Sequence, residues 1–205
     1  MVLTELLAKG GIVMPVIIAL SVYVVAVIIY KLFQFYQTGA FATAFIDSIL
    51  EAVDNKKMSE AMNIAAQNHS PAARVIEATI NSIGNRAISD EKRTRIIEST
   101  AIREIRQYES HMRGLEMVAN LSPLLGLLGT VTGMVKVFAG ISQTGSGVDP
   151  ALLAGGIWEA LLATVAGLAV AIPSLAAHYI FESRIDTIRA NMKDAVMGIL
   201  ARSGN

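Results

Sequence analysis

Residues 117–140 read MVANLSPLLGLLGTVTGMVKVFAG, and residues 151–181 read ALLAGGIWEALLATVAGLAVAIPSLAAHYIF. Each run is longer than the ~20 apolar residues that an α-helix needs to cross the ~30 Å hydrocarbon core of a bilayer. Residues 141–150 between the two runs are short of apolar side chains and contain Gly, Ser, Thr and Asp. The two runs therefore predict a hairpin of two membrane-spanning helices.

A third apolar run, residues 11–30, contains no charged residue. Lys9 precedes it, so a cleaved signal peptide is the competing interpretation. The run is longer than a usual signal-peptide core, and it is followed by Tyr30-Lys31-Leu32-Phe33 without a small-residue cleavage site. We therefore expect residues 11–31 to be retained as the first spanning helix, after a short external lead at residues 1–10.

Composition excludes several other classes of protein. With 53% hydrophobic and 17% charged residues the chain is too apolar for an ordinary soluble domain, and its net charge of zero gives no reason to expect a nucleic acid partner. The absence of cysteine excludes disulfides and thiol chemistry. The three histidines are scattered, and no nucleophile–base pair or metal cluster is visible, so we expect neither an enzyme nor a metal or cofactor site.

The distribution of cations predicts the orientation in the membrane. Of the 17 Lys and Arg residues, 11 lie between Lys31 and Arg113 and 4 follow Phe181. Cations near spanning helices favour the cytoplasmic side. Residues 32–116 and 182–205 are therefore predicted to be cytoplasmic, and the N-terminus and residues 141–150 external.

The segment 32–116 has the pattern of helices. Ser59-Glu60 can open a helix that runs to Asn68, Ser70-Pro71 is a typical helix start, and Ser89 with two following acids opens another helix. No break is evident between this last helix and residues 117–140. If the two are continuous, they form a single helix of about 50 residues, or ~75 Å. Pro123 and Pro173 are expected to bend their helices.

Residues 151–181 exceed the length that a bilayer requires by about ten residues. The excess, followed by the mixed charges of residues 182–205, predicts a helix that continues into the cytoplasm. The expected fold is thus an all-α membrane protein with three spanning helices, two of which extend into a helical cytoplasmic part.

Small residues recur along the hairpin at spacings that leave room for another helix backbone. Two spanning helices that carry hydroxyls and a carboxylate cannot satisfy these groups alone, which predicts further helices and an oligomer. The candidate packing positions are Gly126, Gly129, Gly133, Ala163, Gly167 and Ala171.

Three polar side chains in the hairpin are candidates for an ion pathway: Thr130, Thr164 and Glu159. Hydroxyls and carboxylates can hydrogen-bond water or a hydronium ion without retaining it. The alternatives are that the threonines only bond back to their own helix, and that Glu159 only pairs with Lys136 to fix packing. Lys136 can also extend to the outer membrane surface.

The run from Ser122 to Val131 (SPLLGLLGTV), followed by Gly155 to Thr164 (GGIWEALLAT), Gly167-Leu168 and Ile172-Pro173, resembles the MotA/TolQ/ExbB proton channel family. The resemblance covers about residues 70–185 and is strongest to the ExbB and TolQ branches. Thr130 and Thr164 match the family's pore-facing threonines, and Glu159 matches its membrane glutamate. The flagellar stator branch, with four spans, fits less well.

The resemblance implies an ExbB-like subunit of a bacterial inner-membrane proton channel or motor. Its implied assembly is a homopentamer in membrane lipid that encloses an ExbD- or TolR-like single-span partner, whose membrane aspartate carries the proton. It would drive a TonB- or TolA-like transducer, with its N-terminus periplasmic and its C-terminus cytoplasmic. The alternatives are a TolQ-like subunit for envelope integrity and division, the use of sodium instead of protons, and a passive membrane scaffold.

Overall fold

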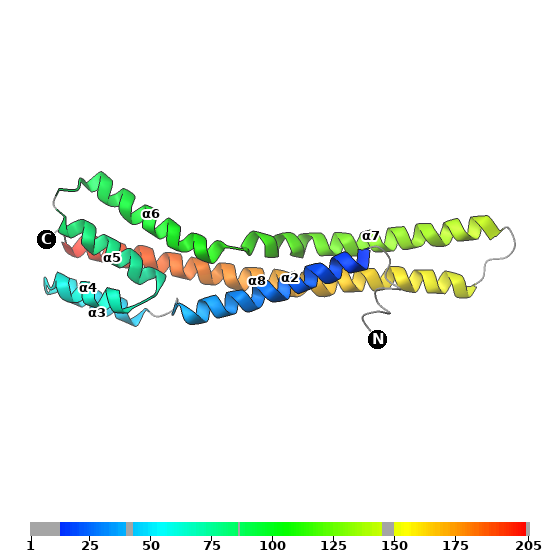
Figure 1. The fold of residues 1–205 in the computed structure, drawn as a ribbon, viewed down its shortest axis with the longest axis horizontal. Coiled ribbons are helices and arrows are strands. Elements are labelled where there is room, and N and C mark those ends of the chain that lie inside the picture. Colours follow the sequence, from blue (N-terminus) through cyan, green and yellow to red (C-terminus); the bar gives the residue numbers. More distant parts are fainter. Residues whose placement is uncertain (1–12, 40–42, 86, 145–149, 204–205) are drawn as a thin grey trace. The chain divides into compact units, whose positions relative to one another are not determined.

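The computed structural model describes residues 13–39, 43–85, 87–144 and 150–203 of the 205 residues. The regular elements in this part of the chain are all helices (Figure 1). They are α2 (Val13–Gln37), α3 (Ala44–Asp54), α4 (Met58–Gln67), α5 (Pro71–Gly84), α6 (Asp90–Glu109), α7 (Met112–Thr144) and α8 (Pro150–Ser203). The all-α fold predicted from the sequence is confirmed.

Three helical stretches are long and apolar enough to cross a membrane, one in α2, one that ends in α7 and one in α8. Their most apolar windows have mean hydropathies of 2.6, 1.8 and 2.1. The chain is therefore a multi-pass membrane protein, as predicted. α2 continues to Gln37, six residues beyond the end expected at residue 31, and α8 runs without interruption through the expected boundary at residue 181.

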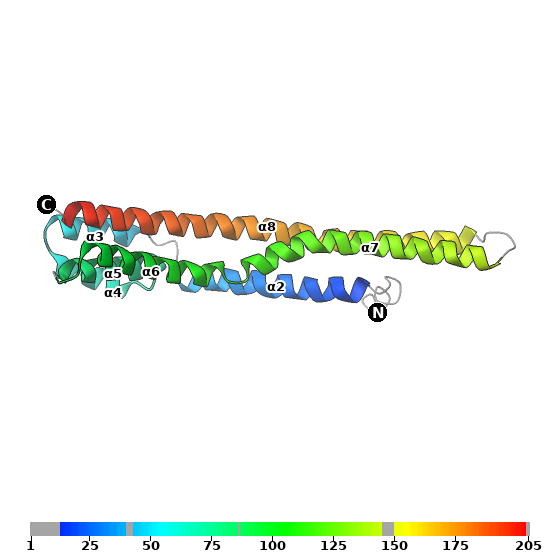
Figure 2. The same ribbon diagram turned by 90° about the horizontal axis from the view of Figure 1, so that it is seen from above.

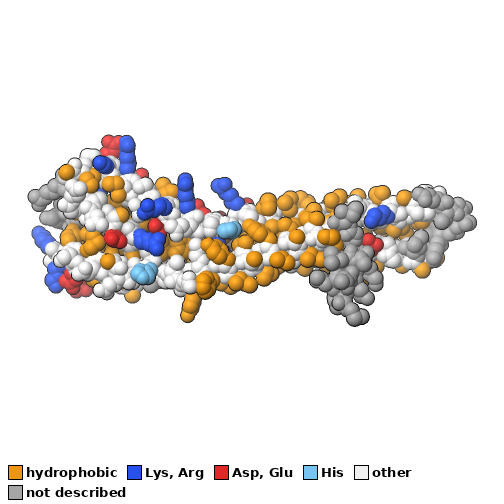
Figure 3. All heavy atoms as spheres, in the orientation of Figure 1, with side chains coloured by type: hydrophobic (Ala, Val, Ile, Leu, Met, Phe, Trp, Pro, Cys, Tyr) orange, Lys and Arg blue, Asp and Glu red, His pale blue; other side chains and the backbone are white. Residues whose placement is uncertain are grey.

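The contacts divide the chain into two units. Unit 1 comprises Met1–Ile29 and His111–Tyr179, and unit 2 comprises Tyr30–Ser110 and Ile180–Asn205. Helices α2 and α8 thus contribute residues to both units. On the face that Figure 3 shows, the coloured side chains of unit 1 are mostly hydrophobic, whereas Lys, Arg, Asp and Glu gather on unit 2.

In unit 1, the first part of α8 lies beside α7, and the first part of α2 lies against this pair (Figures 1 and 2). The contacts between helices depend on small residues. A Cβ atom at Gly114 of α7 would lie 2.0 Å from the hydroxyl oxygen of Tyr23 on α2. Ser174 on α8 donates a hydrogen bond of 2.8 Å to the carbonyl of Leu115 on α7. Contacts of this kind fix the register of the helices, because a bulkier side chain would separate them.

In unit 2, α3, α4 and α5 pack against the end of α8. Their shared core includes Ile49, Ala61, Ile76 and Ile199, each with an exposed fraction of 5% or less. The sequence analysis did not identify α3. Its apolar residues lie on one face, but the segment begins without a capping side chain, because Thr43 makes no cap hydrogen bond.

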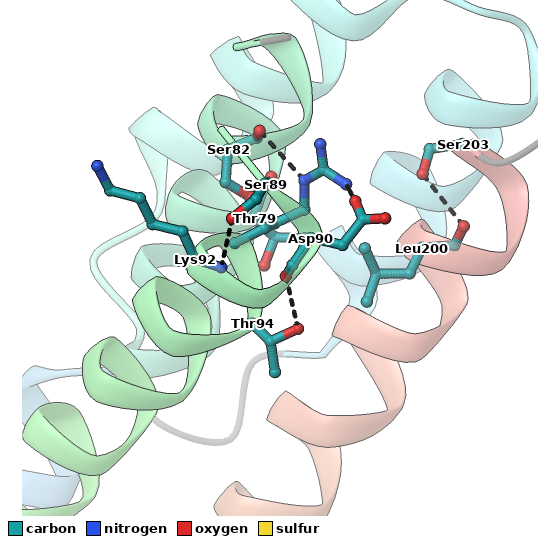
Figure 4. A network of polar contacts seen from close by, with 9 residues as sticks. Thr79, Ser82, Ser89, Asp90, Lys92, Thr94, Leu200 and Ser203 are labelled. Carbon is teal, nitrogen blue, oxygen red and sulfur yellow. Dashed lines mark hydrogen bonds and ion pairs between the residues drawn. The ribbon is translucent and has the colours of Figure 1, made fainter. Parts of the chain in front are cut away.

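The predicted starts of α5 and α6 are confirmed. Ser70 accepts a hydrogen bond from the amide of Ala73, with Pro71 in the first turn of α5. Ser89 accepts one from the amide of Lys92 at 3.3 Å, as Figure 4 shows. Each such cap typically contributes about 1 kcal/mol. The helix expected from Ser59 to Asn68 is also present, as α4 (Met58–Gln67).

The predicted continuous helix from Ser89 through residues 117–140 is wrong. α6 ends at Glu109 and α7 begins at Met112, with a backbone φ of +65° at His111. A non-glycine residue in this region costs about 1 kcal/mol or more, so other contacts must offset it.

Those contacts come from the end of α2. The ammonium group of Lys31 donates to the carbonyl of Tyr108 at 2.5 Å and to the Ser110 hydroxyl at 3.5 Å. The amide of Gln34 donates to the carbonyl of Gln107 at 3.1 Å. Carbonyls in the last turn of a helix lack intrahelical donors, and a cation there also interacts favourably with the helix dipole. Lys31, with an exposed fraction of 0%, therefore terminates α6.

Aromatic stacking reinforces the same region. The ring of Phe35 on α2 lies 5.5 Å from that of Tyr108 on α6 and 5.8 Å from that of Phe181 on α8. Arg189 of α8 forms an ion pair of 2.8 Å with Glu109. The end of α6 is thus held by both α2 and α8.

Both prolines predicted to bend helices lie inside helices that continue past them, Pro123 in α7 and Pro173 in α8. Each removes one backbone donor, which leaves the carbonyl four residues earlier without its usual partner. The bend itself stays a prediction.

Candidate functional site

The predicted packing residues of α7 and α8 lie where the two helices approach most closely. A Cβ atom on Gly167 would lie 2.4 Å from the carbonyl oxygen of Ser122 and 3.2 Å from the Cα of Gly126. A Cβ on Gly126 would lie 2.9 Å from the Cα of Thr164. Since real Cβ atoms do not approach other atoms this closely, only glycine permits the observed separation of the backbones.

The same contact continues toward the end of α7. A Cβ on Gly129 would lie 2.4 Å from the Cβ of Ala163, and one on Gly133 would lie 3.0 Å from that of Ala160. Ala163 and Ala171 are both buried. From the sequence these small residues are predicted to pack helices in an oligomer. In the structure the small residues of α7 pack against α8 of the same chain.

The hydroxyl of Thr130 donates to a carbonyl of its own helix, that of Leu127, at 2.7 Å. Thr132 does the same toward Leu128 at 2.8 Å. Both contacts match the alternative in which membrane threonines bond back to their own helix. The hydroxyl oxygen of Thr130 can still accept a hydrogen bond, because only its proton is used.

Thr164 behaves differently. Its hydroxyl donates across the helix pair to the carbonyl of Gly126 on α7, at 3.1 Å. The side chain therefore contributes to the pairing of α7 with α8 and is half-buried in this contact. The two threonines, which the sequence offered as equivalent, have different partners.

This difference predicts the effect of valine substitutions. Thr164→Val removes a bond between helices, which in membrane proteins averages about 0.6 kcal/mol, whereas Thr130→Val leaves the Leu127 carbonyl with its backbone donor. We expect Thr164→Val to lower the melting temperature in detergent and Thr130→Val to leave it nearly unchanged. Thr164→Ser keeps the hydroxyl and serves as the matched control. Equal melting temperatures for both valine variants would contradict the assignment.

Glu159 is half-buried and lines a pocket of about 460 Å³ between α7 and α8. Lys136 lines the same pocket from α7. The other lining residues are small or apolar: Val137, Gly140, Ala151, Gly155 and Gly156. Lys136 and Glu159 form no ion pair among the contacts of the described residues. The alternative in which Glu159 pairs with Lys136 to fix the packing is therefore not observed in this structure.

The site has one member that sequence reasoning missed. Ser122 is completely buried, and its hydroxyl has no hydrogen-bond partner within the described part of the chain. It lies one turn of α7 before Gly126, at the level of Gly167. Its position directly before Pro123 was the available signal, because a helix that lacks one backbone bond often holds a hydroxyl nearby.

A chemical interpretation follows from these placements. Thr164 and Ser122 lie at the tight contact between α7 and α8, and Glu159 lies at a pocket nearer the start of α8. A carboxylate beside a cavity in an apolar helix pair can take up and release a proton, whereas one enclosed by hydrocarbon cannot do so cheaply. Among the described residues no group of His, Asp and Glu is arranged to hold a metal ion.

Several proteins are similar to this chain. It is 32% identical over 154 residues to the biopolymer transport protein ExbB of Salmonella typhimurium, which covers 75% of this chain and 62% of that protein. It is 37% identical over 87 residues to the biopolymer transport protein exbB1 of Vibrio cholerae, covering 42% and 38%. A putative ExbB homologue of Methanothermobacter thermautotrophicus is 28% identical over 183 residues, covering 89% and 63%. The chain thus spans less than two thirds of the length of each of these relatives.

The sequence model of one family matches residues 37–194, which include α3 to α7 and most of α8. This range contains the tight α7–α8 contact, the threonines and the Glu159 pocket. The resemblance of residues 70–185 is therefore confirmed over a longer stretch. The chain belongs to the MotA/TolQ/ExbB proton channel family.

Proposed function

We propose that this chain is an ExbB-like subunit of a proton channel or motor that couples the proton motive force to a TonB-type protein for transport at the outer membrane. The observation that carries the proposal is the position of Glu159. It is the single Asp or Glu residue in residues 150–181, and it lines a pocket within the apolar helix pair. The names of the similar proteins, which describe biopolymer transport, support the same branch.

The energetics fit this proposal. A proton that crosses a potential of 100 mV releases about 2.3 kcal/mol. An ionisable group in the hydrocarbon region costs several kcal/mol unless it has a cavity or a partner. Retaining a carboxylate at such a position is therefore reasonable only if the group does more than fill space.

The assembly belongs to the proposal. We place the chain in a homopentamer around an ExbD- or TolR-like single-span partner, which would supply an aspartate that residues 13–37, 112–144 and 150–181 of this chain lack. A TonB- or TolA-like transducer would receive the work. The apolar residues exposed on α7, such as Leu124, Leu127 and Val131, would face neighbouring subunits, the partner or lipid.

Proton flux into proteoliposomes tests the proposal. The complex of the chain with its single-span partner should pass protons under an imposed potential, and Glu159→Gln should abolish most of this flux without loss of the complex, because glutamine hydrogen-bonds but does not ionise. The matched control is Asp194→Asn, an exposed carboxylate on the polar part of α8. Wild-type flux in Glu159→Gln would contradict the proposal.

The second candidate function is a passive membrane scaffold. It is favoured by the hydroxyls of Thr130 and Thr164, both of which are bonded to backbone carbonyls as packing residues would be. A scaffold of this kind would pass no protons with or without its partner, so the same flux measurement distinguishes the two functions. Neither candidate requires an enzymatic activity, and we propose none.

We also propose that the chain lies in the bacterial inner membrane with its N-terminus in the periplasm. The support is the charge asymmetry, with 15 of 17 cations on one side. Reporter fusions after Gly84 should be active only as cytoplasmic reporters, and fusions after Gly145 only as periplasmic ones. The reverse pattern would invert the orientation.

A further inference from the structure

The charges in the spanning segments of unit 1 are few and opposite. Residues 117–144 contain one residue among Asp, Glu, Lys and Arg, which is Lys136, and residues 150–181 contain one, which is Glu159. Residues 13–30 of α2 contain none. Isolated charges in a spanning helix are expensive, and they are found facing a cavity or one another. Lys136 and Glu159 are therefore candidates to face each other or a shared cavity.

The structure places both side chains on one pocket of about 460 Å³. On one wall α7 and α8 are in close contact, because a Cβ on Gly156 would lie 2.0 Å from a methyl carbon of Val137. On the other side there is open space, since a Cβ on Gly140 or Gly155 would meet nothing within 4 Å. The small lining residues thus leave two long, oppositely charged side chains room to approach each other.

We infer that Lys136 is the counter-ion of Glu159, and that the two side chains close over the pocket as an ion pair when Glu159 is ionised and separate when it takes up a proton. In the structure the two side chains line the same pocket, and no ion pair joins them among the contacts of the described residues. The inference rests on the proposed role of Glu159 and gives Lys136 a positioning role in it. The arrangement of the two side chains would then depend on whether Glu159 is protonated.

The other charged groups near this level are few. Among the described residues, Lys136 is the charged side chain that lines the pocket with Glu159. Asp149, and Glu5 and Lys9 in the lead, lie outside the described residues. Asp149 is close in sequence to the pocket-lining Ala151, so it is the competing partner for Lys136 that the experiment has to include.

The experiment is a double-mutant cycle on the purified complex, read as melting temperature at several pH values. At about pH 8, Lys136→Met and Glu159→Gln should each lower the melting temperature by roughly 2 °C or more, and the double variant should lose no more than either single variant, because both remove the same pair. As the pH falls low enough to protonate Glu159, the effect of Lys136→Met should disappear. Lys136→Arg, which keeps the cation, should resemble the wild type.

Two outcomes would overturn the inference. Additive effects of Lys136→Met and Glu159→Gln would show that the two side chains do not interact. The second outcome is that Lys136→Met lowers the melting temperature in the Glu159→Gln background as it does in the wild type, but not in an Asp149→Asn background. That result would show that Lys136 pairs with Asp149 and not with Glu159. A variant that fails to assemble is replaced by Lys136→Gln, which retains polarity and still removes the charge.

Proton flux separates this inference from the proposed function. Because Lys136 only positions the carboxylate, Lys136→Met should reduce the flux without abolishing it, whereas Glu159→Gln should abolish the flux. If Glu159→Gln abolishes flux and the cycle shows no coupling, the inference alone fails. If Glu159→Gln retains flux, the proposed function of Glu159 fails, and so does the positioning role that rests on it.

Discussion

Replacing Gly167 by alanine should disrupt the pairing of α7 with α8, whereas the same change at Gly155 should be tolerated. The methyl group at Gly167 would lie 2.4 Å from the Ser122 carbonyl oxygen and 3.2 Å from the Cα of Gly126. Both are backbone atoms, so neither can rotate away. The helices would have to separate, which would also stretch the hydrogen bond from Thr164 to Gly126. Overpacking of this kind typically costs about 1–3 kcal/mol.

The control is on the same helix. A methyl group at Gly155 meets nothing within 4 Å, and alanine favours a helix over glycine by about 1 kcal/mol. Gly155→Ala should therefore keep or raise the melting temperature in detergent, while Gly167→Ala lowers it by several degrees. Similar melting temperatures for the two variants would contradict the close backbone contact.

A compensating pair sharpens the test. At Gly129 the nearest obstacle is a side chain, the Cβ of Ala163 at 2.4 Å, and the next atoms lie at 3.9 Å or more. Gly129→Ala should therefore destabilise the helix pair, and Ala163→Gly in the same chain should restore much of the loss, because it removes the obstacle. Gly167→Ala has no such rescue, since its obstacles are backbone atoms.

Lys31→Met should loosen the end of α6. Methionine has a similar length and no charge, so the change leaves the Tyr108 carbonyl, which Lys31 contacts at 2.5 Å, without this donor. An unsatisfied buried polar group costs about 1–3 kcal/mol. Removing a buried charge can instead stabilise a protein when the charge was poorly paired. Here Lys31 has three acceptors, including the Gln34 side chain at 3.0 Å, so we expect the loss to dominate.

Hydrogen exchange with mass spectrometry is the suitable measurement. Peptides that contain residues 105–113 should exchange faster in Lys31→Met, and peptides from α3 should be unchanged. Lys57→Met, at an exposed ion pair with Glu60, is the control and should alter neither. Unchanged protection at the end of α6 in Lys31→Met would show that Lys31 is not needed to terminate the helix.

Local signals predicted much of the fold. The caps at Ser70 and Ser89 depend on residues within three positions of each other, and the spanning helices depend on uninterrupted apolar length. Features of this kind can be read from a single sequence. The resemblance to the family placed Thr130, Thr164 and Glu159, although composition and spacing alone left each of them with a structural alternative.

The break between α6 and α7 could not be predicted in this way. Ser110-His111 contains neither Gly nor Pro, and the groups that terminate α6 lie 77 and 73 residues away, at Lys31 and Gln34. In the sequence Lys31 has the position of an ordinary cation flanking a spanning helix. Only the folded chain shows that it is buried and that its donors replace those of the missing helical turn.

The carbonyl oxygen of Gly126 links the two candidate threonines, because both of them donate a hydrogen bond to it. In a continuous α-helix the amide of Thr130 donates to the carbonyl four residues earlier, which is Gly126, and the hydroxyl of Thr164 donates to that same oxygen. The Gly126 carbonyl oxygen therefore accepts two hydrogen bonds, one from an amide on α7 and one from a hydroxyl on α8. The nitrogen chemical shift of the Thr130 amide should therefore change when the Thr164 side chain changes its rotamer. A nitrogen label on α7 can thus be used to follow a side chain on α8.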